Sequence, residues 1–153
     1  MVEQAYLIDS HCHLHDQEFF APEVQLALLE KAVKNQVQKI ICIGTDHQDS
    51  LHAAKFTEQH PEFQLFWSYG IHPSECDKKR PKIDLIKIPK PPVAIGEVGL
   101  DYHYGREFRD AQITLFEEML ELSQKSNLPL IFHVREAFDD FFAVLDNFSN
   151  QEI

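Results

Sequence analysis

The sequence predicts an α/β fold in which parallel strands alternate with helices, and three observations support this prediction. Five short segments rich in β-branched and aromatic residues alternate with stretches of helical periodicity. Apolar residues run almost without interruption through IICIG, LFWSYG and PLIFHV, as is typical of strands buried on both faces of a sheet. Most glycines lie at or near the carboxyl ends of these segments, where a parallel α/β sheet binds its ligands.

The expected strands and helices follow one another along the chain. The strands are predicted over Ala5–Asp9, Lys39–Gly44, Gln64–Gly70, Val93–Gly99 and Pro129–Val134. Pro22, a favourable residue for a first helical turn, opens the first helix. The apolar positions of this helix are spaced three and four apart: Leu26, Leu29, Val33 and Val37. Asp49 or Ser50 is expected to cap the second helix, which ends at His60.

The later connections are predicted from the same signals. The proline-rich stretch from Pro73 to Pro92 is expected to be irregular, with at most a short helix near Ile83 to Ile86. Two further helices show apolar residues at spacings of three and four. Their apolar positions are Leu115, Met119 and Leu122 for one, and Phe138, Phe141, Phe142 and Leu145 for the other.

The length of the repeating unit points to a barrel. Strand–helix–strand repeats imply parallel pairing with right-handed crossovers. The 153 residues divided among five units give about 31 each, which is also the unit length of an eight-unit barrel of ~250 residues. We therefore expect residues 1–153 to form a single domain, a partial TIM-type (β/α) barrel with about five of the eight units.

Composition and charge narrow the function. The chain has 14 Lys and Arg residues against 25 Asp and Glu, a net charge of -11, which argues against binding of phosphate backbones by a basic surface. Binding of an anionic substrate would therefore need cations that the protein itself does not supply, such as metal ions. Three cysteines without CxxC spacing indicate neither a disulfide framework nor a thiolate zinc site. Without an apolar run of ~20 residues or a signal-peptide pattern, we expect a cytoplasmic protein that does not enter a membrane.

Polar side chains recur at the carboxyl ends of the predicted strands. Asp9, His11 and His13 lie two apart in IDSHCHL, so an extended chain points all three to one side, where two imidazoles can reach one metal ion. The other strand ends carry His72 in YGIHP, Glu97 in AIGEVGLDY, and His133 and Arg135 in LIFHVRE. Burial of such groups costs free energy unless they are paired or bound to a metal. Together they predict a metal centre at this end of the sheet.

Other residues carry weaker signals. His15 and His103 are expected in loops beside this end of the sheet, with no role assigned to them. Trp67 and the phenylalanines are more typical of a core than of platforms that stack on bases.

Taken in order, the segments DSHCHL, GIHP, GEVGLDY and FHVRE resemble the successive motifs of the TatD-type metal-dependent deoxyribonucleases, a family of amidohydrolase-like barrels. The resemblance runs from about Tyr6 to about Phe148. It implies an eight-unit (β/α) barrel with two divalent ions at its mouth. It also implies hydrolysis of phosphodiester bonds in DNA, with a single strand or a 3′ end as the substrate.

The resemblance further implies a role for each matching residue. His11 and His13 would bind one ion, and His133 would bind the second. Glu97 would bridge both ions, which makes it the expected catalytic residue. Imidazole and carboxylate ligands accept Zn, Mn, Mg or Co, and the imidazoles favour Zn, Mn or Co over a purely Mg site.

Four more residues have implied roles around this centre. His72, Asp101 and Arg135 match positions near the substrate phosphate. The planar guanidinium of Arg135 suits a phosphate group. Asp9 would lie behind the ligands and orient a histidine.

The family pattern continues beyond the fifth helix. A histidine on the sixth strand and an aspartate on the seventh or eighth would complete the ion sites, whereas the sequence ends at Ile153. We therefore expect a C-terminally truncated barrel of impaired activity, unless its exposed edges pair with a second copy or with a separately encoded second half. Self-association of the chain is our hypothesis among these.

Two other functions stay open at this point. A related barrel could use the same metals to hydrolyse a small amide or lactone, and a closed small-molecule pocket would indicate this reaction. A non-catalytic half-barrel could instead bind a partner through its open edges, and it would then take up no metal and cleave no DNA.

Overall fold

Five parallel strands form one sheet, in which the order in space equals the order in the chain. The computed structural model of the protein describes residues 6–78, 85, 90–103 and 105–149. The strands are β1 (Leu7–Cys12), β2 (Val37–Ile43), β3 (Gln64–Tyr69), β4 (Ala94–Asp101) and β5 (Leu130–Arg135). Each neighbouring pair is parallel. The predicted half-barrel of five strand units is therefore confirmed, and β1, β4 and β5 extend past their predicted carboxyl ends.

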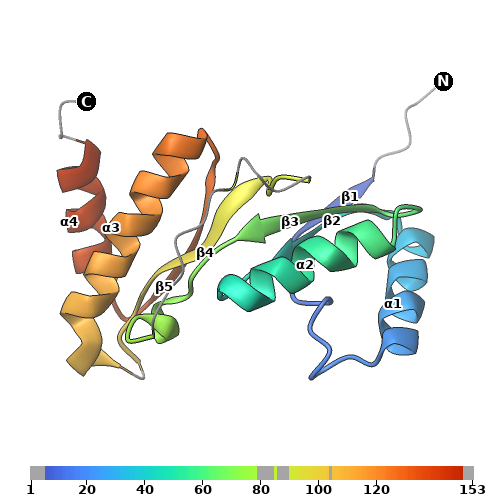
Figure 1. The fold of residues 1–153 in the computed structure, drawn as a ribbon, viewed down its shortest axis with the longest axis horizontal. Helices are drawn as coiled ribbons and strands as arrows, with labels where there is room; N and C mark the ends of the chain where they lie inside the picture. Colours follow the sequence, from blue (N-terminus) through green and yellow to red (C-terminus); the bar gives the residue numbers. More distant parts are fainter. Residues whose placement is uncertain (1–5, 79–84, 86–89, 104, 150–153) are drawn as a thin grey trace.

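Helices connect the strands and pack against the sheet (Figure 1). In the described part of the chain they are α1 (Pro22–Lys34), α2 (His47–Gln59), η1 (Pro73–Glu75), η3 (Arg106–Phe108), α3 (Arg109–Ser126) and α4 (Phe138–Ser149). α2 packs on β3, α3 packs on β4, and α4 packs on α3 and β5. Figure 1 shows α1 and α2 towards the β1 end of the sheet and α3 and α4 towards the β5 end.

Two predicted helix boundaries were wrong. Val37 begins β2 instead of ending α1, because Gln36 before it has a φ of 67°, which a right-handed helix cannot continue. Asp46, and not Asp49 or Ser50, caps α2, since its side chain accepts a hydrogen bond from the backbone N–H of Asp49. The second helix therefore begins earlier than its sequence signals predicted.

The proline-rich connection after β3 begins with η1, a single short turn. The short helix expected near Ile83 to Ile86 lies outside the described residues, apart from Leu85, which is buried. Within the described residues, no helix combines the length and the apolar character needed to cross a membrane.

Burial on both faces holds for the middle of the sheet but not for its edges. Every residue of β4 is buried, as are most residues in the carboxyl halves of β2 and β3. Leu7 and Ile8 of β1 are 60% and 54% exposed, and Phe132 of β5 is 41% exposed. The prediction was wrong there because no described element covers these side chains. Phe138 and Phe142 of α4 are also exposed, although both belong to the predicted apolar pattern.

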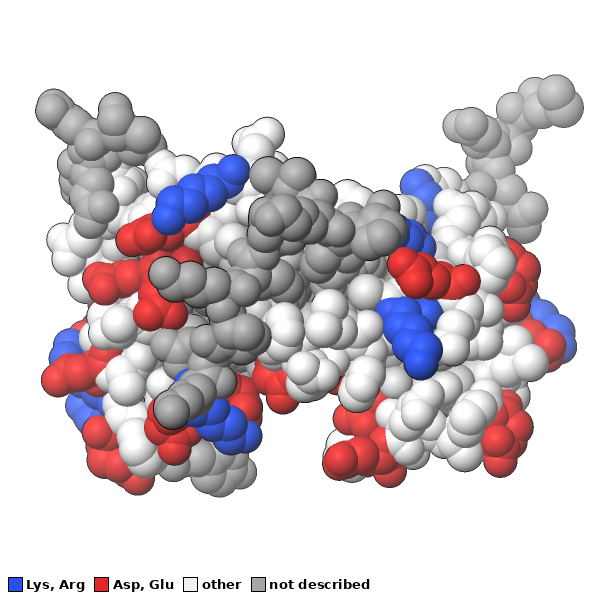
Figure 2. Space-filling model, in the orientation of Figure 1, with Lys and Arg blue, Asp and Glu red and all other residues white. Residues whose placement is uncertain are grey.

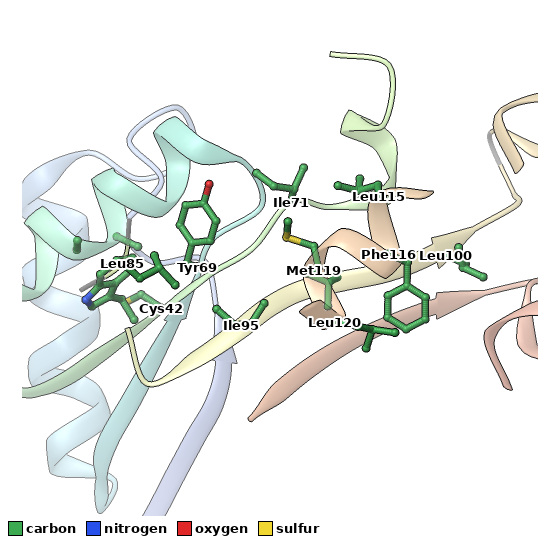
Figure 3. Packing of buried hydrophobic residues seen from close by; sticks show 14 of the residues in the cluster. Cys42, Tyr69, Ile71, Leu85, Ile95, Leu100, Leu115, Phe116, Met119 and Leu120 are labelled. Atoms are coloured by element: carbon green, nitrogen blue, oxygen red, sulfur yellow. The ribbon is translucent and has the colours of Figure 1, made fainter. Parts of the chain in front are cut away.

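The core lies between the sheet and its helices (Figure 3). Trp67 of β3 and Phe116 of α3 are fully buried. Figure 3 shows Leu115, Phe116 and Met119 of α3 next to β4. Phe116 also stacks on Phe141 of α4, with ring centroids 5.4 Å apart. This packing holds β3 and β4 against the helices and so fixes where their carboxyl ends lie.

A buried hydroxyl group ties three strands together near those ends. Ser68 of β3 donates a hydrogen bond of 2.6 Å to the carbonyl of Gly96 in β4. The same oxygen accepts one of 3.3 Å from the backbone N–H of Gly44, which follows β2. Ser68 has no exposed surface, so water cannot replace either bond.

We expect Ser68→Ala to lower the free energy of unfolding by about 1–3 kcal/mol, because two buried backbone groups lose this partner. Chemical denaturation of both proteins measures the change. The control is Ser149→Ala, which removes an exposed hydroxyl at the end of α4 and should cost less than about 0.5 kcal/mol. Equal, small changes in the two variants would contradict the role given to Ser68.

A polar cluster joins the loop after β4 to α3 and α4. Arg109 donates two hydrogen bonds to the carboxylate of Asp140, at 2.6 Å from Nε and 2.7 Å from Nη2. The hydroxyl of Tyr102 donates a third, at 2.7 Å. Arg109, followed by Tyr102, lowers the pKa of Asp140 from 3.8 to about 2. The ionised form of Asp140 is therefore favoured in the folded state.

This shift predicts how the cluster responds to acid. A lowered folded-state pKa means that the ionised Asp140 stabilises the fold above about pH 4, and that this contribution is lost as the pH falls towards 2. We expect Asp140→Asn to melt below the wild type at neutral pH, with the gap shrinking between pH 4 and pH 2. Thermal unfolding followed by circular dichroism tests this, with the exposed neighbour Asp139→Asn as control. A gap that is constant across this range would contradict it.

Candidate metal centre

The two oxygens of the Glu97 carboxylate face different groups of imidazoles. Glu97 lies in β4 and is 9% exposed. Its Oε2 atom is 3.5 Å from Nε2 of His11 and 3.9 Å from Nε2 of His13. Its Oε1 atom is 3.0 Å from Nδ1 of His133. One carboxylate therefore stands between the histidines at the end of β1 and the histidine of β5.

The first group consists of His11, His13 and Glu97, whose ligand atoms all lie within 4.8 Å of one another. Nδ1 of His13 is 3.0 Å from the carbonyl oxygen of Ile43. A carbonyl can only accept, so Nδ1 carries a proton, and the neutral form of His13 then has its lone pair on Nε2, on the side of Glu97. Histidines that bind metals commonly use one nitrogen as ligand and donate the other N–H to a carbonyl in this way.

The second group consists of His72, Glu97 and His133, with ligand atoms again within 4.8 Å. The backbone N–H of Ser74 donates to Nδ1 of His72 at 3.2 Å. Neutral His72 therefore carries its proton on Nε2. A metal ion would need a lone pair at that nitrogen, whereas a phosphate oxygen needs the N–H donor that His72 offers. The hydrogen bonding thus favours substrate contact over metal binding for His72.

His133 lies between two carboxylates, because its Nε2 atom is 2.9 Å from Oδ2 of Asp101. The hydrogen bond to Glu97 raises the pKa of His133, against the effect of burial, and the bond to Asp101 adds to the rise. Burial is the largest single influence and would raise the pKa of Glu97 and of Asp101, but the bond from His133 together with nearby positive charges and, for Asp101, the backbone N–H of His103 lowers both pKa values. Burial and the nearby His133 lower the pKa of His72. The two carboxylates therefore favour the protonated form of His133.

This set of donors fits divalent ions. Imidazole nitrogens combined with carboxylate oxygens suit Zn, Mn and Co, while Mg prefers oxygen ligands alone. The first group offers His11, His13 and Glu97, and the second offers Glu97 and His133. A carboxylate shared between two neighbouring groups is the arrangement that a two-metal site requires. The structure brings these four residues together, and their function as metal ligands stays a prediction.

The remaining predicted site residues lie around this centre. Arg135 is paired with Asp101 in the register of β4 and β5, and it is exposed where β5 ends. Asp9 acts on the backbone, since its carboxylate accepts a hydrogen bond of 3.1 Å from the backbone N–H of His11. Asp9 therefore contacts the backbone that carries His11.

Three successive carbonyl groups at the end of β2 hold residues from other parts of the sheet. We call these groups, in residues Ile43–Thr45, the carbonyl anchor. In order, their oxygens accept from Nδ1 of His13 at 3.0 Å, the backbone N–H of Glu97 at 2.9 Å, and the backbone N–H of His72 at 2.7 Å. The anchor thus sets the relative positions of an expected ligand, the shared carboxylate and the expected substrate contact.

Asp49 in turn holds the carbonyl anchor. Its Oδ2 atom accepts hydrogen bonds from the backbone N–H and the hydroxyl of Thr45, at 2.8 and 2.9 Å. Its Oδ1 atom is 2.9 Å from Nε2 of His15, whose side chain is fully buried. Burial would raise the pKa of Asp49, but the bond from His15 and those from Thr45 lower it. The chain from His15 to Asp49 to Thr45 therefore links the loop after β1 to the anchor.

Sequence reasoning missed two residues that support the centre. The sequence indicates Asp49 only as a candidate helix cap. Its position in the first turn after β2 is the feature that could have suggested its contact with Thr45. Gln112 of α3 is buried, and its amide pairs with both the backbone N–H and the carbonyl of Asp101, at 2.8 and 2.7 Å. A glutamine inside a helix gives no sequence signal for such a contact.

Residues 8–153 match the family described as TatD related DNase. The metal-dependent hydrolase YabD of Bacillus subtilis is 30% identical over 143 residues, which cover 91% of this chain and 54% of YabD. The 3'-5' ssDNA/RNA exonuclease TatD of Rahnella is 31% identical over 127 residues, which cover 79% of this chain and 47% of that protein. The chain thus spans about half the length of the curated relatives it matches.

Comparison with solved structures finds a member of the same family. The crystal structure of YJJV, a TatD homolog from Escherichia coli, is 28% identical and superimposes with a TM-score of 0.76. The match covers 92% of this chain and 55% of that chain. The half-barrel therefore corresponds to part of the fold of a longer relative.

The carbonyl anchor predicts a measurable effect on metal binding. We expect Asp49→Asn to weaken binding of Zn or Mn by about 10-fold, because partners behind the ligands commonly contribute 10- to 100-fold to affinity. Titration calorimetry measures the dissociation constants. The matched control is Asp46→Asn, since asparagine is an equally good helix cap and Asp46 does not hold Thr45. Equal affinities in the two variants would contradict the role of Asp49.

Proposed function

The chain belongs to the TatD-related DNase family, and from this premise we propose that it is a metal-dependent hydrolase of phosphodiester bonds in DNA. The observation that carries the proposal is the position of Glu97, whose two carboxylate oxygens face separate groups of imidazoles. A carboxylate placed in this way can serve two ions at once, as hydrolysis by a two-metal centre requires.

The residues that would hold the ions follow from the two groups. His11, His13 and Glu97 would hold one, and Glu97 with His133 would hold the other. When bound there, divalent ions supply Lewis-acid charge that stabilises the anionic transition state of phosphoryl transfer. Zn, Mn or Co suits these ligands better than Mg alone.

The side chains around the centre supply the contacts to the phosphate. His72 is held as a neutral donor through Nε2, because Ser74 occupies its other nitrogen and burial lowers its pKa. Arg135 offers two parallel N–H donors from the end of β5. The carboxylate of Asp101 holds His133 in place by a hydrogen bond with the Nε2 atom of His133.

The charge of the protein agrees with a centre that uses metal cations. The net charge is -11, and on the face drawn in Figure 2 acidic side chains spread over both halves while basic ones form no continuous stripe. Such a surface does not attract a polyanion by itself. Binding of DNA would therefore depend on the centre and on the few donors beside it.

DNA is proposed as the substrate on two grounds. The family is described as one of DNases, and the Rahnella relative is named as an exonuclease of single-stranded DNA and RNA. A single strand, attacked from its 3′ end, is the form that we propose for this chain.

The test is cleavage of a labelled single-stranded oligonucleotide by the purified chain with Mn, Zn or Mg. We expect Glu97→Gln to lower the rate by at least about 100-fold, because it removes the shared charge while it keeps the side-chain size. Glu121→Gln on the exposed face of α3 is the control and should cleave like the wild type. Hydrolysis of amides or lactones without cleavage of the oligonucleotide would show that the proposed substrate is wrong.

A further inference from the structure

A cavity of about 370 Å³ opens directly beside the candidate centre. His72, His133, Asp101 and Arg135 line one part of it, and these are the groups expected to face the phosphate. Phe108 lines another part. The volume lies within the range of sites that bind small molecules. A ligand in this cavity would therefore have one end at the phosphate contacts and the other against an aromatic ring.

Phe108 differs from the phenylalanines of the core because it is 42% exposed. It ends the short helix η3, and its backbone N–H donates to the carbonyl of Gly105 at 2.9 Å. A Cβ atom on Gly105 would lie 3.3 Å from the Phe108 ring, so glycine lets the ring approach the turn closely. An apolar ring is thus held open to solvent on a cavity wall.

Gln112 fixes this wall relative to the centre. Its amide nitrogen donates to the carbonyls of Asp101 and Gly105, and its amide oxygen accepts from the backbone N–H of Asp101. The turn that carries Phe108 is therefore tied to Asp101, which itself holds His133. These backbone bonds also occupy both ends of the Gln112 amide, so this buried side chain is not available to read the edge of a base.

We propose that Phe108 stacks on the nucleobase of the nucleotide whose phosphate lies at the centre, which makes the cavity a base-binding subsite that is selective for unpaired nucleotides. The inference rests on the proposed function. Base–aromatic stacking contributes similarly for every base because each has a π-face. A base inside a duplex is stacked on both faces and has to leave the helix before it can meet the ring. The subsite therefore selects single strands or frayed ends and shows little sequence preference.

The experiment compares two competitors of a fluorescent oligothymidylate, measured by anisotropy with and without Mn. One competitor is unlabelled oligothymidylate, and the other is an oligomer of the same length made of abasic nucleotides. We expect the wild type to bind the first about 5- to 100-fold more tightly, from the usual contribution of one stacked base. Phe108→Leu should lose this preference because it binds oligothymidylate more weakly while its affinity for the abasic oligomer is unchanged. Phe108→Trp should keep the preference.

Phe142→Leu is the matched control, since Phe142 is also exposed but lies on α4 and does not line the cavity. It should discriminate like the wild type. A wild type that binds both competitors equally, or a Phe108→Leu variant that still discriminates, would overturn the base subsite and leave the proposed hydrolase intact. A wild type that neither binds nor cleaves any oligonucleotide would overturn the proposed function as well.

Discussion

The candidate centre depends on three carbonyl oxygens in one short stretch of backbone. The carbonyl anchor at the end of β2 accepts hydrogen bonds that position His13, Glu97 and His72. Ile43 is the last residue of β2, so the carbonyls of Gly44 and Thr45 lie beyond the strand. Since the three groups are consecutive, a shift of this segment would move the expected ligand His13, the shared carboxylate of Glu97 and the expected substrate contact His72 together.

Hydrogen bonding also separates the roles of chemically similar residues. His13 and His72 are both histidines at strand ends, yet a carbonyl faces the Nδ1 of one and a backbone N–H faces the Nδ1 of the other. In the neutral imidazoles, the first contact leaves the lone pair on Nε2 of His13, on the side of Glu97, and the second leaves the proton on Nε2 of His72. Two identical side chains therefore differ in which nitrogen is left for a ligand, in agreement with the metal role proposed for His13 and the phosphate contact proposed for His72.

The sequence predicts the architecture well because the signals for it are local. Strand composition and the spacing of apolar residues locate all five strands and α1 to α4. The spacing of His11 and His13 indicates a shared partner, and both imidazoles approach Oε2 of Glu97. The errors arise where the outcome depends on distant parts of the chain. The exposure of Leu7 and Phe132 depends on what covers the sheet edges. The contacts of Asp49 and Gln112 connect segments that the sequence leaves unrelated.

The order of the sheet has a consequence for how the centre assembles. Because each strand pairs with the strand that precedes it in the chain, every new strand can dock on a surface that already exists. The anchor directly follows β2, and its partners His72 and Glu97 come later in the chain, after β3 and in β4. His133 arrives last, with β5. The order of these residues along the chain is therefore also their order across the sheet, from His11 on β1 through Glu97 on β4 to His133 on β5.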